Sequence, residues 1–143
     1  MENKINIFLS DLITEYHKLQ NYHWYVKGAE FFNVHAKLEE YYDAFLEVID
    51  EVAETMLMND LKPVASMKQF LEITSIKEAN VEYVTADKVL NDILADFEHL
   101  KKSSIEIKEL ADSEGNYQIS GLMDGYISNF AKNIWMLKQF MMK

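Results

Sequence analysis

The sequence predicts an all-α protein built as a bundle of four long helices, and three observations point to this class. The 143 residues include only four glycines and one proline, so few residues interrupt a helix. Apolar residues recur at alternating steps of three and four, which is the period of an α-helix. Four stretches with this period each span about 25 residues, which suits the helices of a bundle. We expect residues 1–143 to form a single domain with its own hydrophobic core.

The first two long helices are expected over residues 3–27 and 33–59, joined by a turn that begins at Gly28. Asn33 is a suitable N-cap for the second helix. The inward stripe of the first helix includes one histidine: Phe8, Leu12, Tyr16, Leu19, His23 and Val26. The inward stripe of the second helix is wholly apolar: Val34, Leu38, Tyr41, Phe45, Val48, Val52 and Met56.

A long connection leads from the second helix to the third. It breaks around Pro63, and Ser66 with Gln69 has the pattern of a capping box for a short helix that ends near Leu71. Residues 73–84 are expected to be irregular. Thr85 then caps a third long helix over 86–111, and a polar turn over 112–116 leads to the fourth, over 117–141. The inward positions of these two helices are Val89, Ile93, Asp96, Leu100 and Ile107, then Ile119, Leu122, Tyr126, Phe130, Ile134 and Leu137.

The charge balance narrows the choice of partners. The chain has 24 acidic residues and 14 basic ones, all of them lysine, and its formal net charge is -10. Such a chain repels phosphate backbones and has no arginine to read guanine, so direct DNA binding is not expected. It has no cysteine, no apolar run long enough to span a membrane, and no start typical of a signal peptide. We therefore expect a cytoplasmic protein without membrane contact.

Two histidines and three carboxylates stand out as candidate metal ligands: His23, His35, Glu39, Asp50 and Glu54. The four on the second helix lie within about 100° of one another around its axis, so they share one face. Along the axis, however, Asp50 is roughly 22 Å from His35, whereas a metal–ligand bond is about 2 Å. One chain cannot bring both ends to one ion. Two copies with antiparallel second helices, related by a two-fold axis, would form two equivalent sites from complementary halves.

The pattern resembles the ferroxidase signature of the Dps family, the twelve-subunit mini-ferritins. Each step has the family's spacing: His23 with Trp24 beside it, His35 twelve residues later, then Glu39, Asp50 and Glu54 at steps of four, eleven and four. The ending IWMLKQF is also similar to the family. Two positions differ. Residue 39 is Glu where the family usually has Asp, and Thr55 stands where the family often has Arg.

This resemblance implies a ferritin-like four-helix bundle, with the short extra helix in the connection between the second and third long helices. It implies a ferroxidase that oxidises Fe²⁺ with hydrogen peroxide, or more slowly with dioxygen, at a site between subunits. Fe³⁺ would be stored as mineral inside a hollow dodecamer, which protects against oxidative stress. Trp24 is expected to pack at the interface, and the resemblance adds a second role, giving an electron so that radicals are not released.

Other interpretations of these residues stay open. Imidazole and carboxylate ligands also accept Zn²⁺ or Mn²⁺. The family name suggests a nucleoid protein that protects DNA, and a helical adaptor without metal chemistry is a third hypothesis. A histidine beside an apolar face is often a core residue, and an acidic pair four residues apart usually marks a solvated helix face.

Three further features complete the sequence-based predictions. The chain contains no Glu-x-x-His, the motif of the iron site within one bundle, which favours a site between subunits. His17 and His99 fall outside the signature and are expected in surface or core roles. Asp112, Glu114 and Asp124 gather near the start of the last helix, where we expect a solvated turn. The alternative is an acidic lining of a subunit pore that attracts Fe²⁺.

Overall fold

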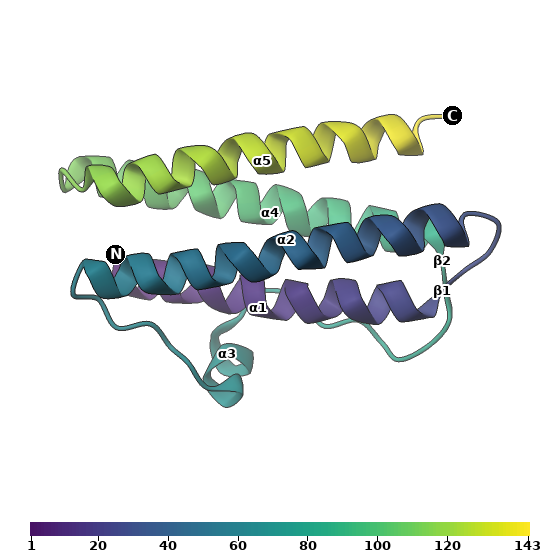
Figure 1. The fold of residues 1–143 in the computed structure, drawn as a ribbon, viewed down its shortest axis with the longest axis horizontal. Helices are drawn as coiled ribbons and strands as arrows, with labels where there is room; N and C mark the ends of the chain where they lie inside the picture. Colours follow the sequence, from purple (N-terminus) through teal and green to yellow (C-terminus); the bar gives the residue numbers. More distant parts are fainter.

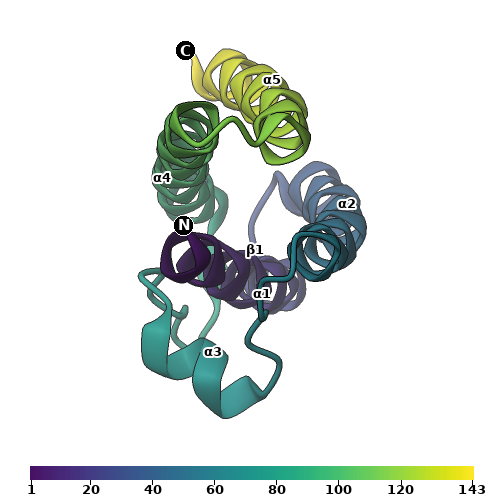
Figure 2. The ribbon, with the colours of Figure 1, turned by 90° about the vertical axis from the view of Figure 1, so that its left-hand side faces the viewer.

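A computed structural model describes residues 1–143 and contains five helices and one two-stranded sheet. The long helices are α1 (Glu2–Tyr25), α2 (Phe31–Met58), α4 (Ala86–Ser113) and α5 (Tyr117–Met141). They run along the long axis of the molecule (Figure 1) and surround one core (Figure 2). The short helix α3 (Met67–Ile73) lies outside the bundle against α1. The predicted bundle, with a short helix in the connection, is therefore confirmed. None of the helices combines the length and the apolar character needed to cross a membrane.

A short parallel ladder joins the end of α1 to the start of α4. The first helix ends two residues earlier than predicted, because β1 (Val26–Lys27) pairs with β2 (Val84–Thr85). Gly28 then turns the chain with a φ of 112°, which residues with a side chain rarely adopt. The end of the connection, expected to be irregular, thus contains a strand. Two residues are too few to show the alternation that predicts a strand.

The start of α2 differs from the prediction, and the assignment of Asn33 as N-cap is wrong. Glu30 occupies the N-cap position. The Phe31 N–H donates to the Gly28 carbonyl at 3.1 Å, so the chain already turns before Asn33 is reached. Asn33 lies in the first helical turn, and its side chain donates to Glu30 at 3.2 Å. The caps predicted for the other two helices are confirmed: Ser66 forms the capping box of α3, and Thr85 caps α4.

A cluster of 28 buried residues forms the core. Most of the predicted inward positions are buried, while Tyr16, Val48, Asp96 and Leu122 are only half-buried. The centre of the core includes Phe97, which the predicted stripe of α4 did not include. Its ring centroid lies 5.1, 5.8 and 6.0 Å from those of three aromatic rings on α2 and α5. The packing of α2 against α4 and α5 therefore rests on aromatic contacts.

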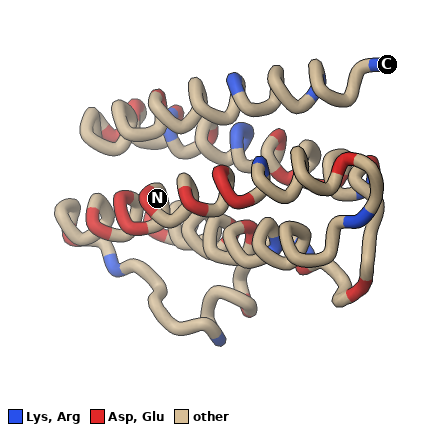
Figure 3. The backbone as a smooth tube through the Cα atoms, turned by 45° about the vertical axis from the view of Figure 1, so that its right-hand side comes forward, with Lys and Arg blue, Asp and Glu red and all other residues tan.

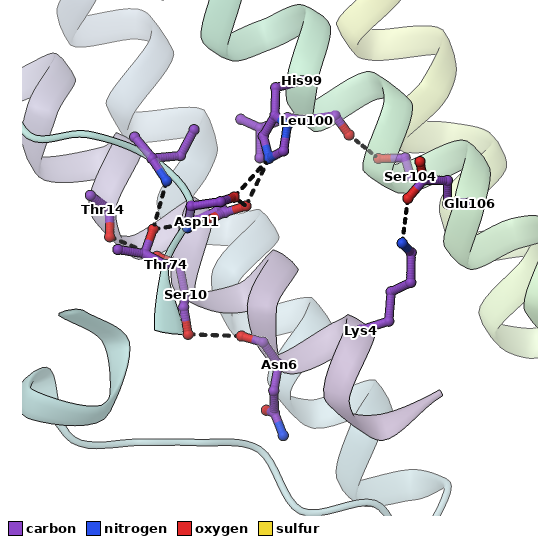
Figure 4. A network of polar contacts seen from close by, with 12 residues as sticks. Lys4, Asn6, Ser10, Asp11, Thr14, Thr74, His99, Leu100, Ser104 and Glu106 are labelled. Carbon is purple, nitrogen blue, oxygen red and sulfur yellow. Dashed lines mark hydrogen bonds and ion pairs between the residues drawn. The ribbon is translucent and has the colours of Figure 1, made fainter. Parts of the chain in front are cut away.

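The long connection is fixed to the bundle by a buried carboxylate of α1. Asp11 is fully buried and accepts hydrogen bonds from the Thr74 hydroxyl at 2.7 Å and from the N–H and hydroxyl of Ser75 at 2.6 and 2.7 Å. Nε2 of His99, on α4, lies 3.0 Å from the same carboxylate. Figure 4 shows Asp11 between Thr74 and His99. His99 thus has a structural contact, as its place outside the signature predicted.

Candidate metal centre

The structure places the five proposed ligands in two groups. His23 lies at the end of α1, beside His35 and Glu39 near the start of α2. We call these three residues the histidine end. Asp50 and Glu54 lie in the second half of α2 and form the acidic end. Because α2 is one continuous helix, the two ends stay roughly 22 Å apart within one chain. Figure 1 shows α2 running from one end of the bundle to the other.

The two histidines orient each other through the backbone. Nδ1 of His23 lies 2.6 Å from the carbonyl oxygen of His35, and Nδ1 of His35 lies 2.7 Å from the carbonyl oxygen of His23. A carbonyl oxygen only accepts, so each Nδ1 carries the proton and each Nε2 keeps a free lone pair. The rings stack with centroids 3.7 Å apart, and Phe31 also stacks on His35. Both imidazole rings are thus held in the tautomer whose Nε2 atom is free to bind a metal ion.

A carboxylate and a phenol complete the histidine end. Oε1 of Glu39 lies 3.7 Å from Nε2 of His23, and the Glu39 side chain is 57% exposed, so it is free to move toward a bound ion. The Tyr42 hydroxyl donates to Glu39 at 3.5 Å, and its ring packs edge-on against His23. Burial, followed by the charges of Glu39 and Asp43, raises the pKa of Tyr42 and keeps the phenol protonated. The signature does not include Tyr42, although it lies two helical turns after His35.

Trp24 lies on the surface of α1 next to the histidine end. Its side chain is 54% exposed, and its indole ring meets the ring of His17 edge-on at 6.0 Å. His17 is also exposed, and it hydrogen-bonds to Gln20 at 3.2 Å. Trp24 is therefore beside the histidine pair and not part of it, and His17 has the surface role that was expected.

The acidic end is open to solvent. Asp50 and Glu54 are exposed, and neither forms a hydrogen bond or an ion pair within the chain. Together with Glu47 and Glu51 they line a shallow surface hollow. Figure 3 shows the acidic segments gathered along this half of α2. Glu51 accepts a hydrogen bond from Tyr126 at 2.5 Å. Asp50 and Glu54 therefore keep all their oxygen lone pairs available to a cation.

No group of three or more His, Asp or Glu side chains comes together within one chain in a form that could hold a metal ion. The chain provides instead an oriented pair of imidazoles at one end of α2 and a separate pair of unpartnered carboxylates at the other. Thr55, which lies between the acidic end and the core, is buried. Its position leaves the carboxylate of Glu54 without a cationic neighbour on the same helix turn.

The expected turn over 112–116 is shorter in the structure, because Asp112 lies in the last turn of α4 and only residues 114–116 separate that helix from α5, which contains Asp124. Nζ of Lys108 lies 3.1 Å from Asp124 and 3.6 Å from Asp112, and the Ser120 hydroxyl donates to Asp112 at 2.5 Å. Glu114, the C-cap of α4, is exposed. Of the three carboxylates, only Glu114 therefore lies in the turn, while Asp112 and Asp124 have partners within the chain on either side of it, and the pore lining stays an alternative prediction.

The fold defines the class of protein. Residues 2–143, nearly the whole chain, match the family described as the ferritin-like domain. The chain is 38% identical to DNA protection during starvation protein 2 of Bacillus anthracis, over 96% of this chain and 93% of that protein.

Solved structures are similar over almost the full length. The crystal structure of antigen TpF1 from Treponema pallidum has a TM-score of 0.96 at 32% identity, covering 99% of this chain and 91% of that one. The DPS protein from Vibrio cholerae O1, described as a member of the ferritin-like diiron-carboxylate superfamily, has a TM-score of 0.94 at 32% identity, covering 99% and 88%. The chain therefore belongs to the Dps family of ferritin-like proteins.

Proposed function

We propose that this protein is a cytoplasmic ferroxidase that stores iron. Two copies with antiparallel α2 helices would bind Fe²⁺ between His23 and His35 of one chain and Asp50 and Glu54 of the other. Glu39 would hold a second, weaker ion directly or through water. The dimers would assemble into a hollow dodecamer that keeps Fe³⁺ as mineral. Membership of the Dps family supports this assembly and this cargo.

One observation carries the proposal: the two ends of α2 are complementary and each is incomplete. The histidine end presents two Nε2 lone pairs, and the acidic end presents two carboxylates without partners. A two-fold axis across the middle of α2 would place each end beside the opposite end of the partner. Imidazole and carboxylate ligands with open positions suit Fe²⁺, and they also accept Zn²⁺ or Mn²⁺. The diiron-carboxylate description of the Vibrio cholerae structure supports a pair of irons.

The reaction at such a site is a two-electron reduction of peroxide. Two Fe²⁺ give one electron each to hydrogen peroxide, which takes up two protons and becomes two water molecules, and two Fe³⁺ remain. Dioxygen would be the slower oxidant. The protein's part is to hold the ions close to each other and to the oxidant. Trp24, which is exposed and follows His23 in the sequence, would supply the second electron when only one Fe²⁺ is bound, so that no hydroxyl radical escapes.

A mixture of two variants tests the shared site. His35→Ala and Asp50→Ala each damage every site when alone, so each should lose fast peroxide-driven iron oxidation. A mixed dimer has one site with both defects and one intact site, because the intact site takes Asp50 from the first variant and His35 from the second. Co-expressed, confirmed heterodimers should recover about half the wild-type rate if separated sites act independently. Stopped-flow measurement of iron oxidation gives the rate, and no recovery would refute the geometry.

The matched control is the double variant His35→Ala/Asp50→Ala paired with the wild-type chain. It contains the same number of lesions per dimer, but each shared site now loses one ligand group. A shared site predicts no intact site in this heterodimer, whereas a site within one chain predicts one. The two mixtures therefore give opposite results under the two geometries. Light scattering on the same samples measures whether the mass is that of a dodecamer.

DNA protection is the second candidate, because the Bacillus anthracis relative is named for it. The net charge of -10 opposes contact with a phosphate backbone, whose affinity for proteins rests on lysine and arginine. We expect no retardation of duplex DNA in a gel-shift assay at low salt. Retardation that disappears as salt is added would favour the nucleoid function instead.

A further inference from the structure

A second cluster of charged side chains lies away from the metal centre, where α1 meets α4. Glu15, Lys18 and Tyr22 come from α1, and Asp92 and Asp96 come from α4. Nζ of Lys18 lies 2.7 Å from Asp96 and 3.2 Å from Asp92, and the Tyr22 hydroxyl donates to Asp92. Lys18 itself is buried. The carboxyl groups of Asp92 and Asp96 therefore share one buried ammonium group.

Glu15 is the member of this cluster without a donor. It is fully buried, and neither of its carboxyl oxygens has a hydrogen-bond partner. Oδ2 of Asp96, on the facing helix α4, is also buried without a well-directed hydrogen bond, although Nζ of Lys18 lies 2.7 Å from it. An ionised carboxylate only accepts, so two ionised groups would repel each other and leave a buried charge unsatisfied. A proton on one of them converts this repulsion into an O–H···O hydrogen bond.

We propose that Glu15 and Asp96 form a buried proton-binding site that holds one shared proton at neutral pH. Glu15 is the neutral acid and donates to Asp96, whose remaining partner is Lys18. Burial, followed by the charge of Asp96, raises the pKa of Glu15 well above its ordinary value, in agreement with this geometry. Burial alone would lower the pKa of Lys18, but the hydrogen bond to Asp96 and the neighbouring carboxyl groups raise it, so the ammonium stays charged.

The site reaches solvent on the side of the long connection. Lys18, Tyr22 and Asp92 line a polar surface pocket. The other charged groups of this pocket are Lys77 and Glu78 from the connection and Lys88 from α4. Lys18 therefore connects Asp96 to this pocket, whereas Glu15 and Asp96 are not among the residues that line it.

The proton makes the contact between α1 and α4 sensitive to alkaline pH. Unfolded Glu15 releases its proton near pH 4.5, whereas folded Glu15 keeps it to a higher pH. The contribution of this group to the free energy of unfolding is therefore fully present below the unfolded pKa, and it is lost as the pH rises through the raised, folded pKa. Gln at position 15 would keep a neutral donor at every pH.

Infrared difference spectroscopy of the assembled, metal-free protein tests the site. At pH 7 the wild type should show the carbonyl stretching band of a protonated carboxylic acid, and Glu15→Gln should lose it. The thermal midpoint of Glu15→Gln should exceed that of the wild type, by more at pH 9 than at pH 5. A wild type without the band, or a band that persists in Glu15→Gln, would overturn the proposal.

Two further variants keep the test decisive. Asp11→Asn is the matched control, because Asp11 is equally buried one turn away but has four donor contacts, whereas Glu15 has none. It should leave the band unchanged. Asp96→Asn removes the charge next to Glu15 and supplies an N–H donor, so the band should disappear at a lower pH than in the wild type. A band that titrates as in the wild type would contradict sharing, even if Glu15→Gln failed to fold.

Discussion

The histidine end and the acidic end of α2 belong to the same helix but differ in how firmly the chain holds them. At the histidine end, each imidazole is tied to the other's backbone carbonyl, and the rings are stacked. At the acidic end, Asp50 and Glu54 stand in solvent with no contact that orients them. In the proposed site, the histidine end is already ordered in the single chain, whereas the acidic end would become ordered only on contact with a cation or a partner chain.

This difference predicts which substitutions the proposed site should tolerate. A preorganised ligand lost its conformational freedom when the chain folded, so it has no further entropy cost on metal binding. Replacing it therefore removes the full free energy of its interaction with the metal. A flexible carboxylate must be ordered on binding, but it can also adapt to a small change of length or position. We therefore expect large, all-or-none effects at the two histidines of the histidine end, and graded effects at the exposed carboxylates of both ends.

The largest effect is expected from His23→Leu. This change removes one oriented ligand and the hydrogen bond to the His35 carbonyl, while Leu retains most of the buried volume at a position that is 6% exposed. Fe²⁺ affinity in an anaerobic titration should fall by about 100-fold or more, beyond the usual effect of an outer-sphere partner. His17→Leu, on the surface of the same helix, is the control and should bind iron normally. A fall of only a few-fold in His23→Leu would show that this imidazole is not a ligand.

A change of pH should have the next largest effect. Protons compete with metal for the two Nε2 atoms, so Fe²⁺ affinity should fall between about pH 7 and pH 5, where ordinary histidines become charged. Titrations at several pH values measure the slope. Affinity that stays constant down to pH 5 would exclude imidazole ligands.

Substitutions at the acidic end should lower Fe²⁺ affinity by graded amounts. Asp50→Asn removes the charge and should weaken Fe²⁺ binding about tenfold, which corresponds to about 1.4 kcal/mol. Asp50→Glu keeps the charge, and because no contact holds this side chain, the loss should be smaller. Glu47→Gln, on the same exposed surface, is the control for net charge. Equal losses in Asp50→Asn and Asp50→Glu would mean that the acidic end is as rigid as the histidine end.

The smallest effect is expected from Glu39→Asp, which shortens the exposed carboxylate by one methylene. Binding of the first ion should be unchanged, and affinity for the second should change by roughly threefold, less than 1 kcal/mol. A titration that counts ions per chain separates the two steps. Glu40→Asp is the control, because Glu40 pairs with Lys37 and does not contact His23. Loss of the first ion in Glu39→Asp would place Glu39 among the primary ligands.

Several features follow from the sequence alone because they depend on one helix at a time. Apolar steps of three and four determine which face of each long helix is buried, and all four helices lie within a few residues of their predicted bounds. The N-cap roles of Ser66 and Thr85 are local in the same sense. The rise of 1.5 Å per residue separates His35 from Asp50 in any straight helix, so the division of the ligands into two ends also follows from the sequence.

Other features were decided only by tertiary structure. Asn33 has the chemistry of an N-cap, but the turn at Gly28 starts α2 before it. The two hydrogen bonds between His23 and His35 form only if α1 and α2 pack in the correct axial register. Asp11 and Glu15 look equivalent in the sequence, as acidic residues one turn apart on α1, yet Asp11 contacts the connection and His99, while both carboxyl oxygens of Glu15 are buried without a partner. Periodicity determines which side of a helix faces inward, but only the packing of helices determines which group lies opposite, and that partner sets the charge and the hydrogen bonds of a buried side chain.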